Sequence, residues 1–180
     1  MDSLVEELLM GVVETLTGRN ADFAATGAYS DLRLMPRLKT IVIGCVDPRV
    51  DPDEVLGIAP GEVATLRNVG GRVTPGLLHE LEMLRTVVQA GGGDIGPGWE
   101  FIVLHHTDCG ITRLEGQPAM LSQFFGTDQQ HLAEQAVSDP RAAVARDVAA
   151  LRDNPRVPGV RVSGLVYDVA TGLTETVVQP

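Results

Sequence analysis

The pattern of apolar and polar residues predicts β-strands that alternate with α-helices along most of the chain. The run Lys39–Gly44 is short, apolar and rich in β-branched residues, and it ends directly at a cysteine. Such a run is typical of a strand buried inside a parallel sheet. A second strand is expected over Glu62–Leu66, and Trp99–Leu104 is the clearest strand pattern in the sequence. A final strand is expected over Val160–Val169, before a threonine-glycine turn.

Apolar residues recur at helical spacing in two segments between these strands. The first covers Pro75–Val88 and is followed by a glycine-rich connector over residues 91–98. Asp139 and Pro140 supply an N-cap and a proline at the first position of the second helix, which should stop before Asn154. Helices in these positions allow the strands that they connect to run parallel.

The opening of the chain has apolar residues at near-helical spacing from Leu4 to Leu16. Gly18 and Asn20 then predict the end of this helix. Because the pattern is amphipathic, the helix has an apolar face to cover. Either it packs across a neighbouring chain or it covers the protein's own core.

The alternation of strands and helices predicts an α/β fold with a mainly parallel β-sheet flanked by α-helices. A chain of 180 residues can form one domain with a real core but is too short for two independent ones, so we expect a single domain over residues 1–180. Its 44% hydrophobic and 21% charged residues lie in the ordinary globular range. Open sheets of this kind bind ligands at the carboxyl ends of their strands.

The formal net charge of -10 argues against nucleic acid as a partner, because phosphate binding needs clustered Lys and Arg. No stretch approaches the ~20 apolar residues needed to cross a bilayer, and the start carries Asp and Glu where a signal peptide carries Lys or Arg. We therefore expect a cytoplasmic protein with no membrane partner. Its two cysteines are expected to be reduced thiols, since a chain of this size needs no disulfide.

Both cysteines and one histidine stand where a metal ion could bind. A catalytic zinc site usually takes three protein ligands and leaves one position for water, and two thiolates with one imidazole are an attested set. His106 lies three positions before Cys109, so one turn could supply two ligands, and Cys45 at the end of another strand could supply the third. His-x-x-Cys alone is a weak motif, because a buried thiol in a turn also fits it.

A carboxylate and a guanidinium follow the first cysteine within four residues. In Cys45-Val46-Asp47-Pro48-Arg49, the acid and the base would stand at the mouth of the same sheet as the thiol. A metal ligand, a hydrogen-bond acceptor and its counter-charge are thus expected together. This combination favours a catalytic site over a buried thiol.

Taken together, Cys-x-Asp-x-Arg followed at a distance by His-x-x-Cys resembles the motif pair of the β-carbonic anhydrase family. Two further segments resemble the family: Arg67–Gly71 after the second strand and Val162–Gly172 at the last strand and turn. The double histidine and Asp51-Pro52 resemble one bacterial subgroup of the family. The resemblance covers the chain from about residue 20 to its end.

The resemblance implies Zn²⁺ as cofactor, with Cys45, His106 and Cys109 as its ligands and Asp47 with Arg49 as the catalytic dyad. The implied reaction is reversible hydration of carbon dioxide to bicarbonate by zinc-bound hydroxide. In some family members the aspartate leaves the arginine and becomes a fourth zinc ligand. Close relatives hydrolyse carbonyl sulfide or carbon disulfide with the same ligands, so these are alternative substrates. The resemblance also implies a homodimer or a dimer of dimers, with residues 1–35 packing on a partner.

Several neighbours of these residues are open to more than one interpretation. His105 is not expected to bind the metal, because adjacent strand residues point to opposite faces. His79, His105 and His131 are the other imidazoles that could carry a proton from the site, and the sequence does not choose among them. Asp108 could hold the ligands in place or cap a helix that begins after Gly110.

Residues of the turn after the second strand form a second group of candidate ligand-positioning residues. They are Asn68, Gly70 and Gly71. Local turn chemistry would explain them equally well.

Two alternative functions would explain some of the same residues. In the first, Asp47 joins the three ligands in a closed structural zinc site of a non-catalytic scaffold, but Arg49 then has no purpose. In the second, a cysteine acts as a redox or nucleophilic thiol. The second is weaker because the chain has no Cys-x-x-Cys motif.

Overall fold

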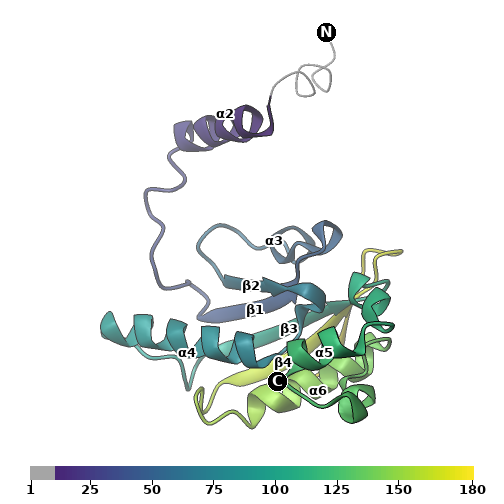
Figure 1. The fold of residues 1–180 in the computed structure, drawn as a ribbon. Helices are drawn as coiled ribbons and strands as arrows, with labels where there is room; N and C mark the ends of the chain where they lie inside the picture. The colour runs from purple at the N-terminus through teal and green to yellow at the C-terminus, as the bar shows by residue number, and fades with distance from the viewer. Residues whose placement is uncertain (1–10) are drawn as a thin grey trace. The chain divides into compact units, whose positions relative to one another are not determined.

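The computed structural model describes residues 11–180 of the protein (Figure 1). The chain divides into two compact units, Met1–Leu34 and Met35–Pro180. The described part of the first unit contains the helix α2 (Val12–Ala25). The second unit contains the sheet and all the residues that the sequence singles out for chemistry. A single domain over residues 1–180 stays a prediction.

A five-stranded sheet with the order β2-β1-β3-β4-β5 forms the centre of the second unit. Its strands are β1 (Thr40–Cys45), β2 (Ala64–Asn68), β3 (Glu100–His106), β4 (Arg161–Tyr167) and β5 (Thr174–Val178). The first four strands pair in parallel, and β5 pairs antiparallel with β4. The predicted mainly parallel α/β fold is confirmed.

Helices and short 3₁₀ turns connect the strands of the second unit. The α-helices are α3 (Pro52–Val55), α4 (Pro75–Ala90), α5 (Pro118–Phe125) and α6 (Pro140–Arg152). The 3₁₀ segments are η1 (Pro48–Val50), η2 (Val69–Gly71), η3 (Gly110–Leu114) and η4 (Gln129–Gln135). Among residues 11–180, no helix is both long and apolar enough to cross a membrane.

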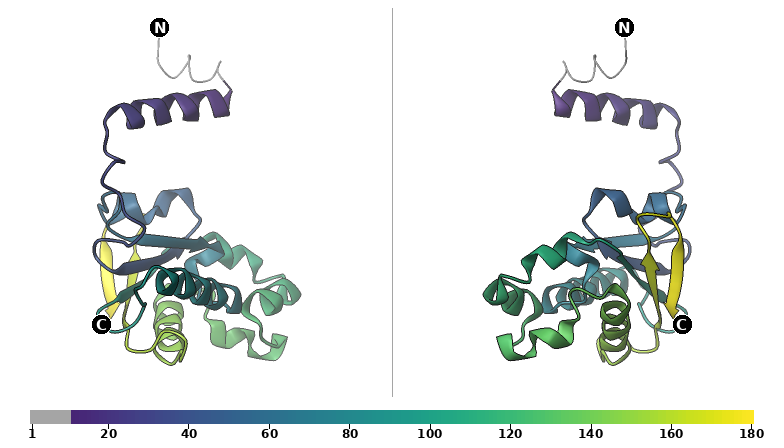
Figure 2. Two further views of the ribbon diagram at one scale, coloured as in Figure 1. Left: turned by 90° about the vertical axis from the view of Figure 1, so that its left-hand side faces the viewer. Right: turned by 90° about the vertical axis from the view of Figure 1, so that its right-hand side faces the viewer.

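Helices α4 and α6 cover the same face of the sheet, and the segment that contains α3 lies over the other face (Figures 1 and 2). Strand residues two apart share a face, and those that meet α4 and α6 form the main apolar core. Its buried members include Ile41, Ile43, Leu77, Leu81, Phe101, Val103, Val144, Val148, Leu151, Val162 and Val166. Burial of this face favours the observed strand register, because a shift of one residue would turn the core side chains of the shifted strand to the opposite face.

Capping side chains set the starts of α4 and α6, as the sequence predicts for α6. The Asp139 carboxylate accepts hydrogen bonds from the backbone N–H groups of Arg141 (2.9 Å) and Ala142 (3.1 Å). Thr74 caps α4 through the N–H of Leu77 (3.2 Å). Each bond satisfies a donor that has no partner within its helix.

The predicted end of the N-terminal helix is wrong. Residues 1–10 of the expected segment lie outside the described residues, but α2 continues through Gly18 and Asn20 and ends at Ala25. A glycine inside a helix costs only about 1 kcal/mol relative to alanine, which does not force an end. The helix stops where the Thr26 hydroxyl bonds to the Phe23 carbonyl (2.6 Å), before Gly27 at φ 70°. The sequence pattern also failed to predict α5 and β5.

Helix α6 packs so closely on β4 that Gly164 has no room for a side chain. A Cβ at Gly164 would lie 3.0 Å from Cγ2 of both Val144 and Val148, and branched side chains have few ways to move aside. We expect Gly164→Ala to lower the free energy of unfolding by about 1–3 kcal/mol through overpacking. Chemical denaturation measures the change.

Gly116→Ala is the matched control, because no heavy atom lies within 4 Å of a Cβ built there and the residue has no positive φ. Its stability should stay within about 0.5 kcal/mol of the unmodified protein. Equal stability of the two variants would contradict the described packing of α6.

Candidate metal centre and catalytic dyad

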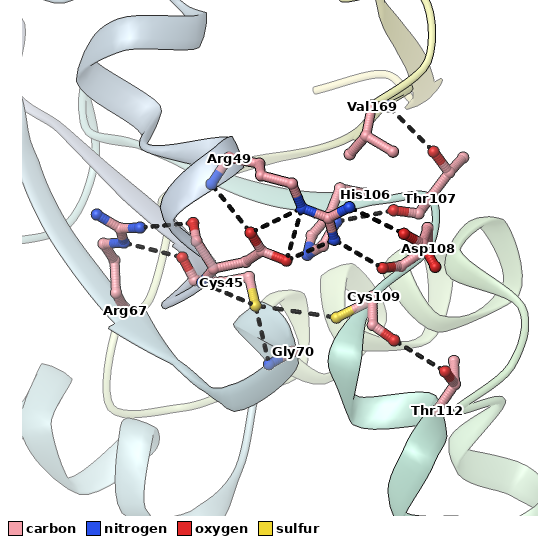
Figure 3. Close-up of polar contacts among 11 residues, drawn as sticks. Cys45, Arg49, Arg67, Gly70, His106, Thr107, Asp108, Cys109, Thr112 and Val169 are labelled. Atoms are coloured by element: carbon pink, nitrogen blue, oxygen red, sulfur yellow. Dashed lines mark hydrogen bonds and ion pairs between the residues drawn. The ribbon is translucent and has the colours of Figure 1, made fainter.

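The carboxyl ends of β1 and β3 bring together the three residues expected to bind metal. Cys45 is the last residue of β1, His106 is the last residue of β3, and Cys109 follows in the next turn (Figure 3). One ligand atom from each of the three lies within 4.8 Å of the other two. The two sulfur atoms are 3.8 Å apart, and both thiols are free.

The sulfur of Cys45 is buried and lies near two backbone donors. It accepts hydrogen bonds from the N–H groups of Gly70 (3.3 Å) and Asp47 (3.4 Å). The nearby Cys109 thiol lowers the pKa of Cys45 to about 4 against the opposing effect of burial, and His106 and the two N–H groups lower it further. Cys45 is therefore a thiolate near neutral pH, which is the form that binds metals.

Cys109 shows the converse effect. Its interaction with the Cys45 thiolate, followed by burial, raises the pKa of Cys109. Two neighbouring thiolates without a cation between them repel each other. A cation bound between the sulfur atoms would remove this repulsion and stabilise both in the thiolate form.

His106 has the hydrogen bonding of a metal-binding imidazole. Its Nδ1–H donates to the carbonyl of Thr107 (2.9 Å), which leaves Nε2 with a free lone pair. Nε2 is buried and has no hydrogen-bond partner within residues 11–180. A histidine that binds a metal through one ring nitrogen commonly donates a hydrogen bond from the other. The buried Nε2 without a partner therefore fits a metal-binding atom. Two sulfurs and one nitrogen form a set that suits zinc.

Asp47 and Arg49 form a close ion pair beside these candidate ligands. Arg49 Nη2 donates to Oδ2 of Asp47 (2.7 Å), and the Arg49 backbone N–H and Nε donate to Oδ1 (2.9 and 3.1 Å). These bonds from Arg49 lower the pKa of Asp47 to about 2, although burial acts in the opposite direction. Asp47 is therefore a fixed carboxylate at all pH values near neutrality.

Asp108 binds the same guanidinium from the other side. Arg49 Nη1 donates to Oδ2 of Asp108 (2.8 Å), and Nη2 donates to its carbonyl oxygen (3.0 Å). The residue has φ 53°, which turns the chain between His106 and Cys109. The alternative interpretation as a helix cap is wrong, since Cys109 occupies the N-cap position of η3. Arg49 instead joins Asp108 to Asp47.

Arg67 supports the dyad through the backbone, a role that the sequence did not predict. Its Nε donates to the carbonyl of Cys45 (2.8 Å), and its Nη2 donates to the carbonyl of Asp47 (3.0 Å). Arg67 also forms an ion pair with Asp51. Arg67 belongs to a segment that resembles the family in sequence. The carbonyl groups to which it donates are set by the pairing of β2 with β1.

The remaining histidines differ in their access to solvent. His105 is 3% exposed and its Nε2–H donates to the carbonyl of Gly71 (3.1 Å), so it lies outside the ligand group. His79 and His131 are exposed, and His79 lies near Glu82 (3.7 Å). A small pocket of about 40 Å³ borders His106 and Cys109, which is room for a few water molecules.

Comparisons with known proteins agree with this geometry. Residues 40–121 match the family model described as carbonic anhydrase. β-Carbonic anhydrase 1 of Mycobacterium tuberculosis is 30% identical over 169 residues, covering 91% of this chain and 96% of the relative. Carbon disulfide hydrolase of an Acidianus strain is 26% identical and covers 72% of each chain.

Solved structures of the same kind share the fold. The carbonic anhydrase of Streptococcus mutans is 28% identical with a TM-score of 0.71, covering 93% of this chain and 98% of that one. The carbonic anhydrase of Glaciozyma antarctica is 27% identical with a TM-score of 0.67, covering 90% and 95%. Since the mycobacterial relative is matched over nearly its whole length, this chain belongs to the β-carbonic anhydrase family.

Proposed function

We propose that this protein is a zinc-dependent enzyme of the carbonate dehydratase type, which interconverts carbon dioxide and bicarbonate. The observation that supports this most is the convergence of Cys45, His106 and Cys109 beside the Asp47–Arg49 pair. A metal site alone would suit a scaffold, but a carboxylate held by an arginine beside it suits catalysis. The mycobacterial β-carbonic anhydrase that matches nearly the whole chain supports the same reaction.

In this proposal Cys45, His106 and Cys109 hold the zinc ion. When bound, zinc supplies a Lewis acid that lowers the pKa of a coordinated water and so provides a nucleophile in mild conditions. The protein must present two thiolates and one neutral imidazole to hold it. The low pKa of Cys45 supplies one thiolate, a bound cation would stabilise Cys109 as the second, and the Nδ1–H bond of His106 leaves Nε2 free.

Asp47 orients the attacking water in this proposal. Its carboxylate accepts the hydrogen of that water, while Arg49 occupies the other acceptor positions and fixes the direction of the remaining lone pairs. Asp108 and Arg67 keep the guanidinium and the backbone of this loop in place. Buffer can carry the released proton away.

Hydrolysis of carbon disulfide or carbonyl sulfide is the alternative. Two carbon disulfide hydrolases, at 26% and 24% identity, are among the similar proteins. The same ligands and the same aspartate would act on a linear molecule in which sulfur replaces oxygen. Measured release of hydrogen sulfide, with carbon dioxide hydration near background, would favour this alternative.

We also propose a homodimer or a dimer of dimers, with residues 1–35 packing on a partner. Helix α2 carries the apolar residues Val12, Val13 and Leu16, which a helix cannot bury against itself. A cytoplasmic location stays a prediction.

Removal of either dyad residue should abolish turnover without releasing the metal. We expect Asp47→Asn and Arg49→Gln to lower kcat/KM for carbon dioxide hydration by at least ~100-fold, because orientation of the attacking water is lost. Stopped-flow hydration assays on the zinc-loaded proteins measure the rate, and metal analysis should still find one zinc per chain.

Asp94→Asn is the matched control for these variants. Asp94 pairs with Arg85 (2.7 Å) away from the site, and this pairing lowers the pKa of Asp94 to about 2, as Arg49 does for Asp47. The control should keep its full rate. Unchanged rates in both dyad variants would refute the proposed role of Asp47.

The carboxyl group of Asp47 should titrate far below the usual value for aspartate. Carbon-13 NMR should give a pKa near 2 in the unmodified protein, and Arg49→Gln should raise this pKa toward about 4. Because the pKa is lowered in the folded state, the stabilisation from this pair is complete above the unfolded pKa of about 4 and is lost as the pH falls toward 2. An Asp47 pKa that is unaffected by Arg49→Gln would contradict the described ion pair.

A further inference from the structure

A buried charged cluster lies next to the candidate metal centre and contains none of the three candidate ligands. Arg72 is 1% exposed, Asp147 is 0% exposed and His105 is 3% exposed. They come from the end of the η2 turn, from the middle of α6 and from β3. Because burying charge without partners is unfavourable, such a cluster persists only where each member is well paired.

Asp147 is the centre of the cluster. Its carboxylate accepts hydrogen bonds from Nε (2.8 Å) and Nη2 (3.1 Å) of Arg72 and from the backbone N–H of Val73 (3.0 Å). Nε2 of His105 lies 3.4 Å from the same carboxylate. Burial alone would raise the pKa of Asp147, but His105 and Arg72 outweigh it and lower the pKa. Asp147 is thus a carboxylate that ties α6 to two consecutive residues after the η2 turn.

The η2 turn lies directly against the end of β1. Gly70 and Gly71 have φ of 83° and 64°, which favour glycine. A Cβ at Gly71 would lie 2.8 Å from the carbonyl carbon of Gly44 and 2.9 Å from the nitrogen of Cys45. The turn therefore has little freedom to move toward the strand that carries the first thiol.

Two groups hold the turn in place. Asn68 forms a pair of side-chain bonds with the backbone N–H (2.7 Å) and carbonyl (2.8 Å) of Arg72. The cluster binds the same stretch through Arg72 and Val73 and through the His105 bond to the Gly71 carbonyl (3.1 Å). The result is that the N–H of Gly70 points at the sulfur of Cys45, 3.3 Å away.

We infer that Arg72, Asp147 and His105 are positioning residues that hold the Gly70 N–H against the Cys45 sulfur and so limit how strongly this thiolate donates to the bound metal. The inference rests on the proposed metal site and deepens it. A hydrogen bond to a thiolate withdraws electron density from the sulfur, which keeps the metal more electrophilic. Loss of the cluster would release the turn and make the sulfur a stronger and less well oriented donor.

The test replaces both charges together, so that neither remains buried alone. In the double variant Arg72→Leu/Asp147→Leu, the cobalt-loaded protein should show its thiolate-to-cobalt absorption band at longer wavelength. Zinc affinity, measured by competition with a chelator, should fall by about tenfold or more, because the loss of ligand orientation outweighs the stronger donation by the sulfur. Both measurements report on the metal site and do not depend on catalytic activity.

Val148→Ala is the matched control in the same helix. Val148 is 1% exposed in the main core, so its truncation destabilises α6 without removing a bond to the turn. The control should lose stability but keep the cobalt band and the zinc affinity. A folded double variant whose band and affinity equal those of Val148→Ala would overturn the inference.

A second measurement keeps the inference testable if the double variant does not fold. In the unmodified zinc-loaded protein, the Gly70 amide should exchange its hydrogen as slowly as the amides of β1, because the cluster holds it on the sulfur. Rapid exchange of that amide would also overturn the inference. If the unmodified protein shows no thiolate-to-cobalt band at all, the proposed metal site itself fails.

Discussion

The parallel pairing of β1 with β3 is the constraint on which the candidate site depends. This register brings Gly44 beside Leu104, so that Cys45 and His106 leave the sheet at the same edge. Most residues of both strands are buried, and a shift of one residue in register would turn each core side chain to the opposite face of the sheet. The core therefore fixes the separation of the first two ligands, and the short turn from His106 to Cys109 fixes the third.

Charge compensation organises the rest of the site. Arg49 pairs with Asp47 and Asp108, Arg67 bonds to the loop carbonyls, and Arg72 pairs with Asp147. The Arg49 side chain is 48% exposed, so solvent screens its ion pairs and they contribute little to stability. Their effect is on orientation: the arginines limit the positions open to Asp47 and to the turn that contacts the Cys45 sulfur.

Much of this arrangement could be predicted from the sequence where the signal is local. The β-branched run before Cys45, the apolar run before the two histidines and the Asp139-Pro140 cap predicted β1, β3 and α6 correctly. The short spacings within the two motifs predicted which side chains would meet. Local patterns failed for α2, whose interior glycine does not end it, and for β5, whose polar alternation is too weak to distinguish it from a loop.

The features that could not be predicted depend on contacts between distant parts of the chain. In the sequence, Asp147 is indistinguishable from the other polar residues of α6. Its partner Arg72 lies 75 positions away, and only the folded chain brings the two side chains together. Arg67 likewise shows its role only when β2 pairs with β1. The bond between Asp108 and Arg49 spans 59 positions. No periodicity or spacing rule connects such partners.

We propose that Cys45, His106 and Cys109 together hold a zinc ion. X-ray absorption spectroscopy at the zinc edge of the purified, zinc-loaded protein tests this binding most directly. We expect two sulfur neighbours at about 2.3 Å and at least one imidazole nitrogen at about 2.0–2.1 Å, with the sulfur signal halved in Cys45→Ser or Cys109→Ser. A spectrum with only nitrogen and oxygen neighbours would contradict the account.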